Sequence, residues 1–363
     1  DVYKRQTLLF APKDDSKWGK AAAAAKEAID KIEGSSYYGL YYSDEPDNGY
    51  RNYMELFLPS KKWNKEYIFA RNQGTGYSDN IHQEKCMAAN GMGGWSGLCP
   101  TQELVDAYEM ANGSTPIIGY NADGTPIING ASGYLETGFA ATAGKHYPAG
   151  VYNMYVGREP RFYASINFNG QQWRGRQLEF WQGGKDGINV SKVDYCCTGY
   201  LLRKTADEGV DVINGKGGMK EASILFRVGS LYLDYAEALN EAEGPVDDVY
   251  KYVDAIRKRA GLPGLAKGLD KDKMRERIQH ERQIELAFEA GHRYFDCHRW
   301  KIAEKTDNGY MHGMNITATN KVDYSKRSTV GDSRVFEKKH YLFPIPQSEM
   351  DKRIGLVQSP YWE

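Results

Sequence analysis

Two helical patterns that end on a proline constrain the fold more than any other feature of the sequence. Residues 230–243 carry apolar and small side chains at helical spacing, and Gly244-Pro245 ends that pattern. A second helical pattern runs from Val246 to Ala260 and stops at Gly261-Leu262-Pro263. Two helices in about 33 residues, closing on proline, are typical of a tetratricopeptide unit. Because one unit cannot cover its own apolar faces, other helices must stack on it.

The segment from Lys17 to Ile32 is the best candidate for such a stacking helix. It is rich in alanine and repeats apolar residues at helical spacing, with Ser16 as the expected N-cap and Gly34 as the expected stop. Its small side chains favour close packing against a partner helix. The sequence therefore predicts a mainly α fold of tetratricopeptide-like helical pairs, with long irregular loops and a few short β-hairpins.

The middle of the chain, from about Asn72 to Gly218, has a different texture. Gly, Asn, Tyr and Trp dominate, and turn signals at 121–124 and 169–170 indicate loops and hairpins. The alternation in Arg161–Phe168 predicts a short strand, and Pro100–Met110 reads as a helix. Aromatic residues make up 13% of a chain in which 26% of the residues are charged. Many rings should therefore be partly exposed, and exposed rings call for a reason.

A charged run from Glu281 to Trp300 is the most distinctive local pattern. On one continuous helix Glu281, Glu285 and Glu289 would share a face. Three aligned carboxylates can serve acid and base catalysis or bind a metal, and His292 with Asp296 has the spacing of a metal-ligand pair. Nearby arginines favour a structural ion network instead. Those arginines are Arg277, Arg282, Arg293 and Arg299.

Several classes of function find no support in the sequence. A formal net charge of -1 excludes a strong global attraction to nucleic acid or anionic lipid. The sequence contains no nucleophile elbow, phosphate loop, zinc-protease or dinucleotide motif, so we do not expect an enzyme. The five cysteines lack metal-binding spacing. Cys86 and Cys99 could pair in an oxidising compartment, or all five could be free thiols.

The charged run also carries a resemblance to the SusD/RagB family of outer-membrane nutrient-binding lipoproteins. The family signature, ERxxELxFE-G-x-R-x-x-D-x-x-RW, is matched with one extra residue at Ala290. Further blocks agree in order, and the resemblance covers nearly the whole chain. The matching residues are Glu281, Arg282, Glu285, Leu286, Phe288, Glu289, Gly291, Arg293, Asp296, Arg299 and Trp300, with 227–240, 256–261, 341–346 and 358–362 as the further blocks.

The resemblance implies a cell-surface protein that captures a glycan and passes it to a SusC-like TonB-dependent transporter. It implies an outer-membrane location through a lipid anchor, although neither a signal nor a lipidated cysteine is found in this chain. No cofactor is expected, and no calcium-loop spacing is visible. We expect residues 1–363 to form a single SusD-like domain lacking its N-terminal part. Its expected regions are a helical scaffold (7–70), a loop-rich ligand-binding region (71–220) and a tetratricopeptide-like and C-terminal scaffold (221–363).

The family blocks hold helices together and so belong to the scaffold. Ligand residues are therefore expected in the loops of the middle region. Sugars present apolar C–H faces rimmed by hydroxyls, so a ring platform with amide, carboxylate and guanidinium groups beside it suits them. For each ring alone, a place in the core or in loop packing remains the alternative. The candidates are Trp95, Tyr77, Trp173, Trp181, Tyr120, Asn72, Asp79 and Arg174.

Three alternatives to a glycan-binding protein stay open at this point. One is a helical-repeat scaffold that binds a protein on its concave face. Another is a peptide-binding member of the RagB type. The last is a glycan hydrolase, which would need two carboxylates at a catalytic separation.

Overall fold

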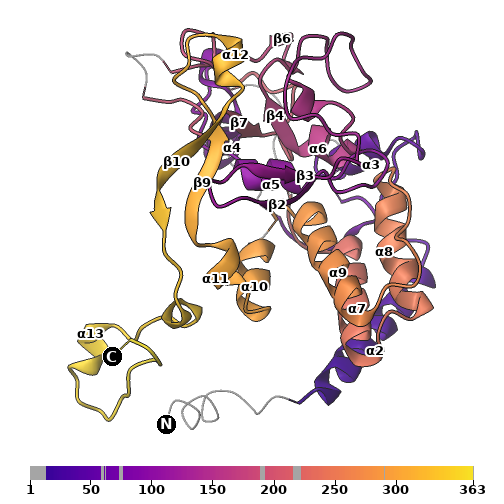
Figure 1. Cartoon of the computed structure of the whole chain (residues 1–363). Coiled ribbons are helices and arrows are strands. Elements are labelled where there is room, and N and C mark those ends of the chain that lie inside the picture. The colour runs from indigo at the N-terminus through magenta and orange to yellow at the C-terminus, as the bar shows by residue number, and fades with distance from the viewer. Residues whose placement is uncertain are drawn as a thin grey trace.

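The computed structural model describes residues 14–58, 61, 63–72, 77–188, 193–215, 222–289 and 291–362, except for the side chains of residues 72, 77–80 and 222. The predicted mainly helical fold with short strand pairs is confirmed (Figure 1). The α-helices are α2 (Ser16–Glu33), α3 (Gly49–Glu55), α4 (Tyr77–Met87), α5 (Gln102–Ala107), α6 (Pro160–Ser165), α7 (Val228–Glu243), α8 (Asp247–Arg259), α9 (Lys271–Glu285), α10 (His292–Arg299), α11 (Ala303–Thr306), α12 (Lys321–Tyr324) and α13 (Gln347–Met350). The 3-10 helices are η2 (Asn90–Met92), η3 (Asn153–Tyr155) and η4 (Lys338–Tyr341). The strands are β1 (Tyr67–Asn72), β2 (Ile117–Tyr120), β3 (Pro126–Ile128), β4 (Ile166–Phe168), β5 (Gln172–Trp173), β6 (Arg176–Gln177), β7 (Tyr200–Leu202), β8 (Ala222–Arg227), β9 (Gly309–Met314) and β10 (Arg327–Arg334).

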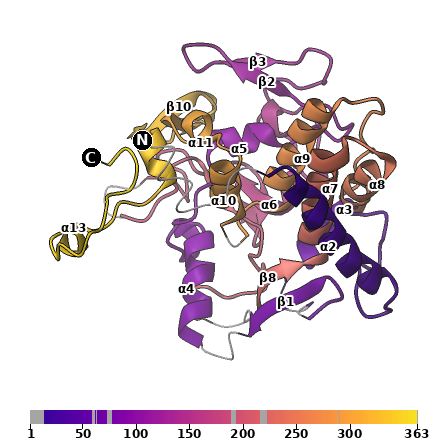
Figure 2. The same ribbon diagram turned by 90° about the horizontal axis from the view of Figure 1, so that it is seen from below.

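Helices α2, α7, α8 and α9 form the helical half of the molecule (Figures 1 and 2). Helix α7 lies at its centre and packs against the other three. The predicted tetratricopeptide-like pair is confirmed as α7 and α8, and α2 is the stacking helix expected from its alanines. Gly244, at φ 87°, ends α7 as predicted. The N-cap of α2 is Asp15 rather than Ser16, which is already helical.

The loop-rich half has its own aromatic core around the antiparallel pair β4 and β7. Phe162 stacks on Phe168 at a ring distance of 5.4 Å, and Tyr155 lies 4.3 Å from Phe168. The strand predicted over Arg161–Phe168 was wrong for its first part. Pro160 starts helix α6, which ends at Ser165, and only Ile166–Phe168 is extended. Helix α5 is likewise shorter than the predicted Pro100–Met110.

The other strands pair as short antiparallel ribbons, β1 with β8, β2 with β3, β5 with β6 and β9 with β10. The turn signal at 121–124 correctly predicted the β2–β3 hairpin, in which Asn121 N–H donates to Thr125 O at 2.9 Å. Figure 2 shows this hairpin projecting from one side of the molecule, with α4 and the β1–β8 ribbon on the opposite side. Within the described residues, no helix is both long and apolar enough to cross a membrane.

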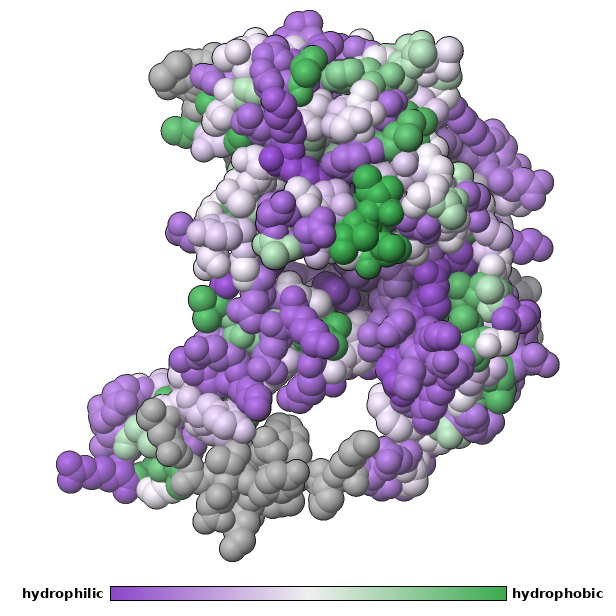
Figure 3. Space-filling model, in the orientation of Figure 1, coloured by the Kyte–Doolittle hydropathy of each residue, from purple (hydrophilic) through white to green (hydrophobic). Residues whose placement is uncertain are grey.

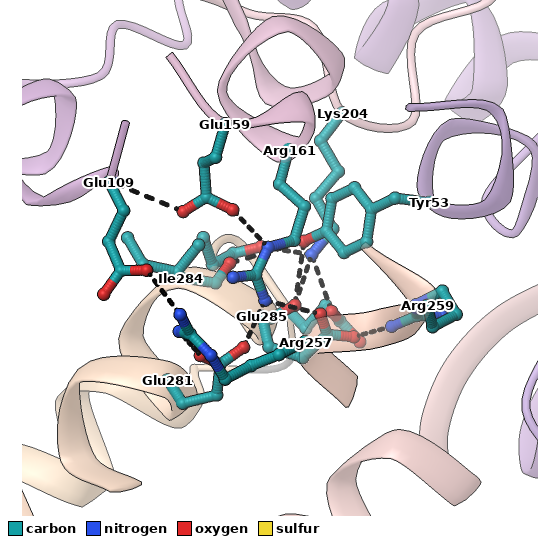
Figure 4. Close-up of polar contacts among 12 residues, drawn as sticks. Tyr53, Glu109, Glu159, Arg161, Lys204, Arg257, Arg259, Glu281, Ile284 and Glu285 are labelled. Carbon is teal, nitrogen blue, oxygen red and sulfur yellow. Dashed lines mark hydrogen bonds and ion pairs between the residues drawn. The ribbon is translucent and has the colours of Figure 1, made fainter. Parts of the chain in front are cut away.

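A buried ion network, which we call the junction network, joins the two halves (Figure 4). Arg161 of α6 reaches two carboxylates of α9, with Nη1 2.5 Å from Glu281 Oε1 and 3.0 Å from Glu285 Oε2. Arg257 of α8 connects Glu281 with Glu109 of the loop-rich half. The network contains equal numbers of carboxylates and cations, namely Glu66, Glu109, Glu159, Glu281, Glu285 and Glu289 with Arg161, Lys204, Arg227, Arg257, Arg259 and Arg277.

The network corrects two expectations about the charged run. Helix α9 ends at Glu285, so Glu289 does not continue its face, although Arg227 and Lys204 still bring it into the same network. The partners of Glu281, Glu285 and Glu289 come from other elements rather than from neighbouring arginines of the run. Burial alone would raise the pKa of Glu285, but the surrounding arginines hold it far below its usual value.

Gly229 makes room for this network. A side chain there would place its Cβ 2.3 Å from Arg227 Nη1 and 2.8 Å from Glu66 Oε1. In this chain the space is filled by the Arg227–Glu66 ion pair, whose atoms are 2.6 Å apart.

The five cysteines are free thiols in the structure, which is the second of the two alternatives that the sequence left open. Cys86 does not pair with Cys99. The Cys99 Sγ lies instead 3.8 Å from Cys196 Sγ, across the loops that precede α5 and β7.

Candidate functional site

A cleft of about 640 Å³ opens where the loop-rich half faces α10 and α11. Its walls come from α5, the β2–β3 hairpin, the connection from α9 to α10, α11 and β9. Figure 3 shows the molecule hollowed between its upper body and the helices below, with an apolar patch over the hairpin. Ile118 and Ile127 of the hairpin are 63% and 41% exposed. The cleft has the size of ordinary ligand pockets.

Four exposed aromatic rings line this cleft from four separate elements. Tyr120 lies on β2, Phe288 follows α9, Tyr294 lies on α10, and Tyr310 lies on β9. Their exposed fractions are 43%, 46%, 46% and 53%. Side chains this apolar are rarely left so open without a contact to make. The cleft therefore offers ring faces of the kind that bind the C–H surfaces of sugars.

Phe288 is held in a strained backbone conformation at the edge of the cleft. Its φ of 61° is in the left-handed region, which disfavours a bulky side chain. The junction network fixes the backbone on both sides. Lys204 Nζ donates to Glu285 O at 3.2 Å and to Ala287 O at 2.7 Å, and it also pairs with Glu289. Strain that the surroundings impose at an exposed site points to a functional position.

The polar groups of the cleft fall into two kinds. Some are already engaged, such as Glu103, which lies 2.6 Å from His312 Nδ1, and Asn308, whose amide donates to Phe336 O at 2.8 Å. Burial and the neighbouring Asp106 raise the pKa of Tyr120 above its usual value, and its hydroxyl donates to Asp106 at 2.7 Å. By contrast, Arg293 makes no hydrogen bond or ion pair with any residue that the structure describes. Its guanidinium is free to meet a ligand.

Tyr120 is the predicted candidate that the structure places in this cleft. Trp95 is 37% exposed, but it packs against α4, with its ring 5.3 Å from His82 and 5.4 Å from Lys85 Nζ. In Figure 2, α4 lies on the opposite side of the molecule from the hairpin that carries Tyr120. These two rings therefore do not form one platform.

The other candidates are scattered. Trp173 is only 2% exposed, and Arg203 covers its ring at 4.7 Å, so it belongs to the core. Arg174 is bound to Glu84 at 3.2 Å and to Asp207 O at 2.8 Å. Trp181 is half-buried, with Lys321 Nζ 5.0 Å from its ring. The side chains of Asn72, Tyr77 and Asp79 lie outside the described residues.

Sequence reasoning missed Phe288, Tyr294, Arg293 and Tyr310 as site residues. The first three belong to the family-like charged run, which we had assigned to the scaffold. Gly291, at φ 75°, marks a break there that allows α10 to turn its rings towards the cleft. The metal reading of the same run finds no support. Asp296 is bound instead by Arg282 and Arg299, at 2.9 and 2.8 Å.

Comparison with known proteins gives a consistent picture. A sequence model described as the SusD family matches residues 58–362. SusD-like protein P25 of Formosa agariphila is 42% identical over 82 residues, which cover 22% of this chain and 15% of that relative. The solved structure of BT4246 has a TM-score of 0.75 and 26% identity, covering 96% of this chain and 63% of that chain. A SusD-like protein (BF3747) of Bacteroides fragilis has a TM-score of 0.70 and 27% identity, covering 96% and 62%. The chain thus matches less than two thirds of the length of each of these proteins.

Proposed function

The chain belongs to the SusD family, and from this premise we propose that it binds a glycan in the 640 Å³ cleft without altering it chemically. The observation that supports the proposal is the set of exposed rings that four elements contribute to the cleft lining, namely Tyr120 of β2, Phe288 after α9, Tyr294 of α10 and Tyr310 of β9. Rings contributed by separate elements can stack on successive faces of a sugar chain. The free guanidinium of Arg293 then supplies donors to sugar hydroxyls.

The ion pairs made by carboxylates of the cleft favour binding of a glycan over its hydrolysis. Glu289, one of the carboxylates that line the cleft, is held by Arg227 and Lys204 at 2.8 and 2.6 Å. These cations lower the pKa of Glu289 although burial opposes them, so it stays ionised and engaged. A glycan hydrolase normally needs a pair of carboxylates that flank the bond to be cleaved. Among the carboxylates that line the cleft, Glu103 lies 2.6 Å from His312 Nδ1 and Glu289 is held by cations, which leaves Asp307 without such a pair. We therefore propose capture of the glycan rather than hydrolysis.

We further propose that the protein works at the bacterial cell surface and hands its glycan to a SusC-like TonB-dependent transporter. The family to which the chain belongs supports this assignment. Outer-membrane fractions of the source bacterium, solubilised in mild detergent, should yield the protein together with such a transporter. Recovery of the protein alone, in fractions that do contain the transporter, would count against the partnership.

The binding proposal is tested with a panel of neutral polysaccharides, namely starch, xylan, mannan and galactan, in affinity electrophoresis. We expect retention by at least one of them, and loss of that retention in Tyr310→Ala and Tyr294→Ala. Tyr37→Ala is the matched control, because Tyr37 is 81% exposed and does not line the cleft. Equal mobility in every gel, with all variants folded, would overturn the proposal. Release of new reducing ends from the retained glycan would instead show a hydrolase.

A peptide ligand is the second candidate, and Arg293 is the observation that favours it. A free guanidinium beside rings can also bind a peptide carboxylate bidentately. Calorimetry with a random tetrapeptide mixture separates the two, because the glycan proposal expects no heat of binding from it.

A further inference from the structure

A second pocket, of about 340 Å³, lies on the loop-rich half and is separate from the cleft. Tyr50, His146 and Tyr147 line it, together with Lys145, Gln171 and Arg203. A neighbouring cavity of about 380 Å³ shares Tyr50, Lys145, His146 and Tyr147 with it. The two cavities therefore flank one ledge of aromatic rings.

Ring contacts and a hydrogen bond hold the ledge in place. The Tyr50 and His146 rings lie 4.7 Å apart, and both His146 and Tyr147 pack against Tyr163, at 5.1 and 6.1 Å. Gly144 lets the Tyr147 ring fold back over the loop, since a Cβ there would come within 2.4 Å of the ring. Arg203 Nη2 donates to the Tyr50 hydroxyl at 2.5 Å, which fixes that ring.

A buried donor in this pocket lacks a partner. Gln171 is only 2% exposed, and its Oε1 accepts from Phe168 N–H at 3.2 Å. Its Nε2 amide has no hydrogen-bond partner among the described residues. A buried N–H group without an acceptor costs free energy. This atom has almost no accessible surface, so a ligand oxygen meets it only when the Gln171 side chain turns towards the pocket.

The charges around the pocket favour an anion. Its described lining contains Lys145 and Arg203 and no carboxylate. Lys145 is exposed and makes no ion pair with a described residue, while Arg203 shares its charge with Glu208 at 3.0 Å. Burial, together with these two cations, lowers the pKa of His146 to about 4. The imidazole is therefore neutral at pH 7, mainly because it is buried.

We propose that this pocket binds an acidic sugar unit, whose anionic group faces Lys145 and Gln171 Nε2 while its ring packs on the Tyr50–His146–Tyr147 ledge. The inference rests on the proposed function only in taking the ligand to be a glycan. It adds the chemical class of that glycan, an acidic rather than a wholly neutral one. Carboxylate and sulfate groups share this chemistry, and the experiment distinguishes them.

Calorimetry with three probes on one galactose skeleton tests the proposal. The probes are galactotetraose, tetragalacturonic acid and a sulfated galactotetraose. We expect one of the anionic probes to bind about tenfold more tightly than the neutral probe, the equivalent of one charge-assisted hydrogen bond. Added salt should reduce that advantage. The tighter anionic probe identifies the group as carboxylate or sulfate.

Two variants and one control locate the effect. Lys145→Gln removes an exposed charge and leaves the fold alone, and Gln171→Glu keeps the Oε1 acceptor but replaces the donor with a like charge. Both should abolish the preference for the anionic probe. Lys321→Gln, next to Trp181 and outside the pocket, should leave it unchanged. Equal affinity for all three probes, or an anionic preference that survives Lys145→Gln, would overturn the proposal.

A second readout keeps this test apart from the cleft. The pKa of His146, measured by NMR, should rise when the anionic probe binds, because a negative charge then faces the imidazole. A saturating probe that leaves this pKa at its starting value would also overturn the proposal. Loss of neutral-glycan binding in Tyr310→Ala concerns the cleft alone, so failure of one proposal is distinguishable from failure of the other.

Discussion

The junction network and the cleft lie on two sides of the same stretch of chain, and they treat polar groups in opposite ways. At the junction, Glu281 and Glu285 are almost fully buried, and every described carboxylate meets a cation. A few residues later, Phe288 and Tyr294 are about half exposed and Arg293 has no described partner. Paired charges stabilise the fold at the junction, whereas the exposed rings and Arg293 are open to a ligand. One segment thus provides both the support and part of the wall of the proposed binding cleft.

The largest expected effect comes from breaking the junction at Glu285. Glu285→Gln leaves Arg161, Arg227 and Arg259 without their shared carboxylate in a buried site. We expect the free energy of unfolding to fall by about 3 to 5 kcal/mol, as for other broken buried pairs. Urea denaturation measures it.

The control is Glu27→Gln on α2, whose partner Lys31 is exposed. That change should cost less than about 0.5 kcal/mol. Similar losses in both variants would contradict the distinction between the junction and an ordinary surface pair.

Acid should weaken the junction before it affects the cleft. The pKa values of Glu281, Glu285 and Glu289 lie below the usual 4.5, because cations outweigh burial. The folded state then binds fewer protons than the unfolded chain, so their stabilisation is complete above pH 4.5 and is lost as the pH falls below it. The raised pKa of Glu159 acts in the opposite direction. Denaturation curves at pH 7, 5, 4 and 3 should show stability declining mainly below pH 5. Constant stability down to pH 3 would contradict the role assigned to these groups.

Removing a ring from the cleft should have the opposite effect, a loss of glycan affinity with little loss of stability. Tyr310→Ala is expected to change the free energy of unfolding by less than about 0.5 kcal/mol, because the side chain is 53% exposed. Its affinity for the retained glycan should fall about tenfold, as for a ring at the centre of an interface. Calorimetry and urea denaturation of the same preparation measure both quantities. A large loss of stability would place Tyr310 with the scaffold instead.

The smallest expected effect on stability concerns Phe288. Here the sign of the stability change tests whether the backbone is strained. Phe288→Gly relieves a left-handed φ of 61°, worth about 1 kcal/mol, and should leave stability equal or slightly higher while weakening glycan binding. Phe295→Gly is the matched control. Phe295 is 63% exposed but lies within α10, where glycine costs about 1 kcal/mol. Destabilisation of equal size in both variants would contradict the assignment of strain to Phe288.

The sequence predicted those parts of the fold that local residue patterns determine, and missed those that depend on contacts between distant segments. Helices α2, α7 and α8 follow apolar spacing and glycine stops, and all three were predicted. Helix α6 was not, because burial on all sides erases the difference between helical and strand periodicity. The partners of Glu285 could not be predicted either, since Arg161 lies 124 residues away in the sequence.

Most of the rings that line the cleft were not among the ligand residues predicted from the sequence. Tyr120 was chosen as a ring of the loop-rich middle, and it does line the cleft. Trp173 was chosen for similar reasons and is buried, because a short ribbon can bring a ring inwards as easily as outwards. Tyr294 lies in a scaffold-like motif, and only the break at Gly291 turns it to the surface. Burial of single rings is decided by packing between distant segments, which a single sequence does not reveal.

The junction network also bears on the order in which the chain folds. Its partners are far apart along the chain, with a sequence separation of 161 for Glu66 and Arg227 and of 148 for Glu109 and Arg257. Because these charges gain their partners only after distant segments have met, we expect the network to form late in folding. Interactions that form after the transition state act on the rate of unfolding rather than on the rate of folding. We therefore expect the network to slow unfolding while changing the rate of folding little.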